Sequence, residues 1–180
     1  MLSKSDLQSL LQCPRKLWLE HHHPGLAPID DPQSYRRVRD GNQVGEKARK
    51  QLGRNILWPQ SSDHPSEAAA NARHLLAQYP DIPAVEVPME HDGLYARADA
   101  LIPLGNSYVL QETKASSFPL KDDKITLDKP QEHHLDDLAI QAWIMWKSGL
   151  PIAHTELNLL NNRWRYPGGG ITQGCFDSWM

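Results

Sequence analysis

The chain has 180 residues and a formal net charge of −3, which suits one domain around a single hydrophobic core. This charge excludes a global basic field that would attract nucleic acid or an anionic membrane, so a polyanion must be bound by local basic residues. No apolar run approaches the roughly 20 residues that a membrane span requires, so we expect a cytoplasmic protein.

Helices are expected over the first 80 residues. Ser3, with Asp6 three positions later, has the pattern of a helix N-cap, and Pro14 suits the first turn of a continuing helix. Apolar residues and glycines repeat at helical spacing from 35 to 52, and the stretch 66–79 is rich in strong helix formers.

The predicted helix at 35–52 is the one distinctly basic segment. Gly41 and Gly45 interrupt its apolar stripe and predict close packing. Two interpretations of its basic residues stay open, because such a run either solvates a helix or contacts phosphates. The residues are Arg36, Arg37, Arg39, Lys47, Arg49, Lys50 and Arg54.

The pattern then changes from helical spacing to alternation. Residues 85–89 alternate, "HDG" predicts a turn, and 94–104 and 107–114 read as two further strands of a three-stranded antiparallel meander. A helix is expected over 135–149. Within 153–167 we expect a strand, a turn at Asn161–Asn162 and a short partner strand.

Hairpin geometry brings two acids together. A two-residue turn at Gly105–Asn106 pairs residue 104 with 107, and counting outwards from there places Asp99 opposite Glu112. Because side chains alternate along a strand, Lys114 shares the face of Glu112. Spacing alone also allows the alternative that the register is slipped and that both acids are solvated near a sheet edge.

This arrangement has a definite chemistry. Directly opposed carboxylates lie roughly 4.5 to 5.5 Å apart at Cβ and repel each other unless a cation neutralises them. Hard oxygen ligands are typical of Mg²⁺ or Mn²⁺. A neighbouring lysine can orient a water molecule or stabilise charge on a phosphorane-like transition state. The pattern therefore indicates phosphodiester hydrolysis.

Five segments in order carry a resemblance: "LSKSDLQSLLQCPRKLWL", "GNQVGEKARKQLG", "GLYARADALI", "QETKASS" and "HLDDLAIQAWIM". The sequence resembles the PD-(D/E)xK nuclease superfamily and, within it, the RecB-like and CRISPR-adaptation exonuclease branch. The resemblance implies a restriction-endonuclease-like α/β core, in which helices flank a mixed central sheet. It implies one nuclease domain over 1–180, with a helical part at 1–80 and a catalytic sheet and helix at 84–166. The chain is either this domain alone or a fragment of a longer protein.

The resemblance also implies roles for residues. Asp99 and Glu112 would bind Mg²⁺ or Mn²⁺, the Thr113 carbonyl would complete the coordination, and Lys114 would be catalytic. Glu46 stands where relatives carry a histidine or glutamate near the metal. Gln141 matches a glutamine that positions the substrate strand or the catalytic lysine.

Contacts to nucleic acid are expected from basic residues near these acids. Arg97 shares the Asp99 face and is the better candidate for a phosphate contact, and Arg49 neighbours the phosphate path if Glu46 faces the metal. The expected activity is a metal-dependent deoxyribonuclease, an exonuclease or an enzyme of single strands and ends, in DNA repair or defence. The alternative is a non-catalytic module on the same fold that binds nucleic acid or a protein partner.

Three departures from the family pattern stand out. Ala98 takes the place of the proline in the motif's name, and Met145 stands where an aromatic residue is expected after the glutamine. The only cysteines are Cys13 and Cys175, so one chain cannot supply the four thiolates of the iron–sulfur cluster found in some relatives.

Overall fold

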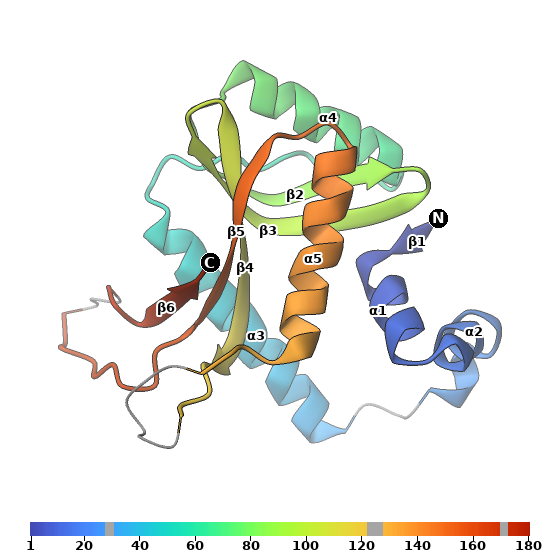
Figure 1. Ribbon diagram of the computed structural model, residues 1–180, viewed down its shortest axis with the longest axis horizontal. Coiled ribbons are helices and arrows are strands. Elements are labelled where there is room, and N and C mark those ends of the chain that lie inside the picture. The colour runs from blue at the N-terminus through green and yellow to red at the C-terminus, as the bar shows by residue number, and fades with distance from the viewer. Residues whose placement is uncertain (28–30, 122–127, 170–172) are drawn as a thin grey trace.

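A computed structural model describes residues 1–27, 31–121, 128–169 and 173–180. The fold is α/β: a mixed six-stranded sheet has the order β1-β3-β4-β5-β6, with β2 paired to β3, and helices pack against it (Figure 1). The predicted α/β class with a mixed sheet and flanking helices is therefore confirmed. No helix in the described ranges has both the length and the apolar character that crossing a membrane demands.

The first two helices begin where local chemistry predicts. Helix α1 (Lys4–Gln12) is capped by Ser3, whose hydroxyl accepts from the Asp6 N–H while the Asp6 carboxylate accepts from the Ser3 N–H. Helix α2 (Pro14–His22) has proline in its first turn, followed by a short 3₁₀ turn at Pro24–Leu26.

The next two helices each begin before the predicted position and end one residue before the predicted end. Helix α3 (Pro32–Gln51) starts three residues before the predicted position because Asp31 caps it, accepting from the Ser34 N–H. Helix α4 (Pro65–Gln78) packs its buried alanines against β2.

The predicted meander is present as β2 (Ala84–His91), β3 (Leu94–Leu104) and β4 (Ser107–Ser117). The predicted hairpin register is confirmed, since the pairs between β3 and β4 run from Leu104–Ser107 to Ala100–Gln111. A two-residue strand, β1 (Leu2–Ser3), pairs in parallel with the start of β3 and was not predicted.

The end of the chain differs from the prediction. Helix α5 (Glu132–Lys147) leads into β5 (Ile152–Leu160), which pairs in parallel with β4. The antiparallel partner of β5 is β6 (Phe176–Trp179), not a strand within 163–167. The turn lies one residue later than predicted, at Asn162–Arg163, because the Trp164 N–H donates to the Asn161 carbonyl. Among the described residues, the chain pairs with the end of β5 again at Cys175, whose carbonyl accepts from the Asn161 N–H.

The hydrophobic core lies where α5 meets the sheet. Leu138, Ile144 and Met145 of α5 pack with buried residues of β2, β3 and β5, including Met89 and Leu157. Figure 1 shows α5 lying across the strands, with α1 beside it and α3 next to β4. This packing places the start of α1 and one face of α5 next to β3.

Candidate active site

A gap in the pairing of β3 positions the candidate site. Strand β2 occupies one edge of β3, so β1 and β4 must share the other. On that shared edge β1 pairs with residues 94 and 95, and β4 pairs with residues 100 to 104. Residues 96 to 99 lie between the two partners. Asp99 is thus at the point where β4 separates from β3.

A cleft of about 640 Å³ opens over this gap. Its floor includes Asp99, Glu112 and Lys114 of the sheet, and its walls come from the start of α1 and from one face of α3. Gly41 and Gly45 line the α3 wall, and a Cβ added at Gly41 would meet no atom within 4 Å. Gly41, which was expected to allow close packing, therefore leaves open space in the cleft, whereas Arg49 occupies the space beside Gly45.

Asp99 is fixed by the backbone of the neighbouring strand. The Thr113 N–H donates a hydrogen bond of 2.8 Å to Oδ2 of Asp99. Burial raises the pKa of Asp99 above its ordinary value, although the hydrogen bond from Thr113 and the charges of Lys4 and Lys114 oppose this. This hydrogen bond joins β3 and β4 just beyond their last regular pair, Ala100–Gln111.

Glu112 is 2% exposed and has donors on both carboxylate oxygens. Oε1 accepts from Nζ of Lys114 at 2.6 Å and of Lys4 at 3.4 Å. Oε2 accepts from Nε2 of Gln141 at 2.7 Å. Burial, followed by the negative charge of Asp99, raises the pKa of Glu112 to about 6. The two predicted acids therefore act on each other electrostatically.

Lys114 lies between two carboxylates. Its Nζ donates to Glu112 and to Oδ2 of Asp137, a residue of α5 that is 1% exposed. Burial alone would lower the pKa of Lys114, but the charges of Glu112 and Asp137 raise it above its ordinary value. Burial likewise opposes ionisation of Asp137, yet Lys114 and Lys4 hold the pKa of Asp137 below its usual range. Lys114 is thus held as a donor between the two carboxylates.

A separate group of charges lies on the other side of Asp99. Val85 pairs with Ala100 and Val87 with Ala98, so Glu86 falls opposite Asp99. Nη1 of Arg49 and Nε of Arg97 each lie 2.9 Å from a different oxygen of Glu86. Glu86 has φ of 52°, a left-handed conformation that is unusual for a residue with a side chain.

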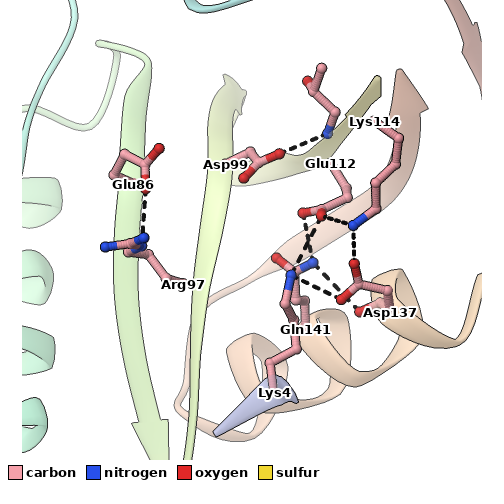
Figure 2. A network of polar contacts seen from close by, with 9 residues as sticks. Lys4, Glu86, Arg97, Asp99, Glu112, Lys114, Asp137 and Gln141 are labelled. Atoms are coloured by element: carbon pink, nitrogen blue, oxygen red, sulfur yellow. Dashed lines mark hydrogen bonds and ion pairs between the residues drawn. The ribbon is translucent and has the colours of Figure 1, made fainter. Parts of the chain in front are cut away.

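Three acids thus form a row across β2, β3 and β4: Glu86, Asp99 and Glu112. Figure 2 shows Asp99 between the Glu86–Arg97 pair and the group of side chains around Glu112. Arginines hold the first acid and lysines hold the third. The middle acid instead accepts from a backbone N–H. A row of this kind concentrates carboxylates and cations in one cleft.

The structure brings together most of the predicted site residues. Asp99, Glu112, Thr113, Lys114, Arg97 and Arg49 all line the cleft. Gln141 is fully buried beneath it and contacts Glu112, and its Nε2 also points to the Asp137 carbonyl at 3.5 Å. Gln141 therefore contacts Glu112, the acid to which Lys114 also donates.

Glu46 is not brought to the site. Its side chain is 60% exposed, and Oε1 lies 2.5 Å from Nζ of Lys50 one turn along α3. Gly45 and Arg49 line the cleft, and position 46 is rotated by about 100° from position 45 around the helix. The expectation that Glu46 faces Asp99 and Glu112 is wrong. The face of α3 that carries Gly41 and Gly45 points towards the sheet, whereas the adjacent face, which carries Glu46, does not.

Sequence reasoning missed three charged residues of the site. Counting outwards from the turn between β2 and β3 would have placed Glu86 opposite Asp99, just as counting from the turn between β3 and β4 placed Glu112 opposite Asp99. Asp137 precedes Gln141 by four residues and so shares its face of α5. Lys4 carries no such signal, because only the docking of β1 onto β3 brings the start of α1 to Glu112.

The carboxylates of the cleft are the groups that could bind a divalent cation. Within residues 1–27, 31–121, 128–169 and 173–180, no three His, Cys, Asp or Glu side chains converge closely enough to hold a metal ion by themselves. Mg²⁺ commonly takes one or two carboxylates, with waters and substrate phosphate oxygens in the remaining positions. Asp99 and Glu112 supply such a pair, and the charge of Asp99 raises the pKa of Glu112. These residues fit Mg²⁺ or Mn²⁺ bound together with a phosphate.

Comparison with models of known protein families and with curated proteins finds no match to this chain. The function must therefore be inferred from the residues and geometry of the cleft.

Proposed function

We propose that this protein is a metal-dependent nuclease with a restriction-endonuclease-like core of the PD-(D/E)xK type, acting on DNA ends or single strands. The observation that carries the proposal is the meeting of Asp99, Glu112 and Lys114 in one cleft, where β4 leaves β3. Two carboxylates that can hold a divalent cation, together with an ammonium group, form a set that can support phosphodiester hydrolysis.

Asp99 and Glu112 would hold Mg²⁺ or Mn²⁺, with the Thr113 carbonyl as a further candidate ligand. A cation bound there would polarise the phosphate and lower the pKa of an attacking water. Lys114 stays protonated, so its ammonium stabilises negative charge that develops on the phosphate oxygens. Gln141 orients Glu112 through its amide and keeps one oxygen of that acid in a fixed direction.

Substrate binding is assigned to the arginine side of the acid row. Arg49 and Arg97 each use one donor group on Glu86 and retain further N–H donors, since a guanidinium carries five. Arg97 is exposed at the cleft, and the Arg49 guanidinium lies 5.6 Å from the ring centroid of Trp58. Two arginines and one glutamate have a net positive charge, which a phosphodiester neutralises.

The test is cleavage of labelled single-stranded DNA, double-stranded DNA and RNA in Mg²⁺, in Mn²⁺ and in EDTA. We expect cleavage of DNA that requires a metal and is lost in Lys114→Ala and Asp99→Asn. Glu46→Gln is the matched control, since Glu46 is an acid of the same chain that lies outside the cleft, and it should retain full activity.

One observation favours the second candidate, a non-catalytic module on the same fold that binds nucleic acid or a protein partner. Both oxygens of Glu112 already accept from lysine or glutamine, and these donors compete with any cation. A chain that binds oligonucleotides through Arg49 and Arg97 but shows no metal-dependent cleavage of any substrate would establish this alternative.

A further inference from the structure

Four charged groups in and beneath the cleft form a closed ring of alternating sign. Nζ of Lys4 lies 2.9 Å from Oδ1 of Asp137 and 3.4 Å from Oε1 of Glu112. Nζ of Lys114 contacts the other Asp137 oxygen and lies 2.6 Å from the same Glu112 oxygen. Each ammonium therefore lies between two carboxylates. We call this set the charge ring; its members are Lys4, Asp137, Lys114 and Glu112.

The ring draws its members from three elements. Lys4 begins α1, directly after β1 pairs with β3; Lys114 and Glu112 belong to β4, and Asp137 belongs to α5. The Asp137 and Glu112 side chains are at most 3% exposed, whereas those of the two lysines are 21% and 26% exposed and line the cleft. The carboxylates are thus the more buried members of the ring, and Figure 2 shows the four side chains gathered between β4, α1 and α5.

We propose that Asp137 is a positioning residue that holds Lys114 against Glu112, and that Lys4 is a second cation of the same catalytic site. Without the Asp137 charge, two ammonium groups would share a single carboxylate and repel each other, so one of them would leave Glu112. Without Lys4, Asp137 would keep only Lys114, and the ring would open on one side. The inference rests on the proposed nuclease function for the role of Lys114, but the ring itself is testable without activity.

The first experiment observes the ammonium groups directly in the full-length protein. Lysine NH₃⁺ signals are recorded by ¹H–¹⁵N NMR, because an ammonium held by carboxylates exchanges its protons with water slowly enough to be seen. We expect signals from Lys4 and Lys114, assigned by their loss in Lys4→Gln and Lys114→Gln. Asp137→Asn should abolish or shift the Lys114 signal, whereas Asp136→Asn, at the exposed neighbouring position of α5, should not.

The second experiment separates positioning from binding in the kinetics. Asp137→Asn should lower kcat by about 10- to 100-fold, the usual effect of removing a group that orients an active-site residue, with a much smaller change in KM. Lys4→Gln should also lower kcat, and Lys4→Arg, which keeps the positive charge, should retain much of the wild-type kcat. The double variant should lose less than the two single losses combined, because both substitutions open the same ring.

Circular dichroism and thermal melting determine whether Asp137→Asn still folds, since removing one partner of a buried ion pair is costly. If it does not fold, Lys4→Gln carries the test, because Lys4 is partly exposed in the first turn of α1. The proposal is overturned if the Lys114 signal is unchanged in folded Asp137→Asn; where Lys4→Gln carries the test, the deciding measurement is kcat. Full kcat in either variant overturns it as well. Absence of cleavage by the wild type would instead refute the nuclease function, whatever the NMR spectra show.

Discussion

The Thr113 backbone N–H donates to Oδ2 of Asp99 at 2.8 Å, one step beyond the last regular pair of β3 and β4. This hydrogen bond gives Asp99 a structural role in addition to its proposed metal role. From strand spacing alone, Asp99→Ala would be expected to stabilise the metal-free protein by relieving repulsion from Glu112. The hydrogen bond changes that expectation, because alanine would leave the Thr113 N–H without its acceptor.

We predict a contrast between two substitutions at Asp99. Asp99→Asn keeps an acceptor for Thr113 and removes the charge, so it should melt in EDTA at the wild-type temperature or slightly above. Asp99→Ala should melt lower, by about 2 to 4 °C for each kcal/mol lost. Millimolar Mg²⁺ or Mn²⁺ should stabilise the wild type and neither variant, since only a ligand of the native state shifts unfolding. Equal metal-induced shifts in all three proteins would contradict a metal site at Asp99.

Acidification should change the stability of the fold through two buried groups, Glu112 and His134, whose effects on stability have opposite signs. The pKa of Glu112 is raised to about 6 by burial and by Asp99, so its contribution to stability is present below about pH 4.5 and lost as the pH rises through 6. The pKa of His134 is lowered to about 4 by burial and by His133, so acidification from pH 6.5 to 4 favours the unfolded chain.

The two contributions oppose each other in one pH window, and substitutions separate them. Glu112→Gln should make stability fall more steeply between pH 6.5 and 4 than in the wild type, by about 2 kcal/mol at most. His134→Gln should instead leave a rise in stability on acidification. Urea unfolding at several pH values measures both, and identical pH profiles for the three proteins would show that these groups titrate alike in the folded and unfolded states.

Salt dependence should identify the arginines that contact phosphate. Binding of single-stranded oligonucleotides is measured in EDTA, to prevent cleavage, over a range of salt concentrations. Arg97→Gln and Arg49→Gln should each weaken binding and reduce the slope of log K against log salt by about 0.7 for one lost phosphate contact. Arg39→Gln is the control, since Arg39 pairs with Asp40 on the exposed side of the same helix. A change in slope as large for Arg39→Gln would remove the assignment to the cleft.

The glycines of α3 allow a test of the cleft wall that needs no substrate. Gly41→Ala should stabilise the protein by roughly 0.5 to 1 kcal/mol, because its Cβ meets no atom within 4 Å and alanine favours the helix. Gly45→Ala should gain less, since its Cβ would come within 3.3 Å of Nη1 of Arg49. Denaturant melts compare the two, and a larger gain at Gly45 would mean that Arg49 does not lie along the glycine face.

Local rules were sufficient for several elements of the site. The N-cap at Ser3 depends on Asp6 three residues away, and both form in the structure as the spacing predicts. The turn at Gly105–Asn106 sets a register that brings Asp99 near Glu112, because strand pairing counts outwards from a tight turn. Side-chain alternation then sets Lys114 on the face of Glu112.

Tertiary packing decided the rest. A helical pattern shows which residues of α3 share a stripe, but not which sector meets the sheet, and Glu46 was misplaced for that reason. Lys4 reaches Glu112 only because β1 fills the edge of β3 that β4 leaves free. Periodicity and turn geometry are properties of neighbouring residues, whereas the choice of partner strand and packing face depends on contacts between residues as far apart as 4 and 112, which no local pattern encodes.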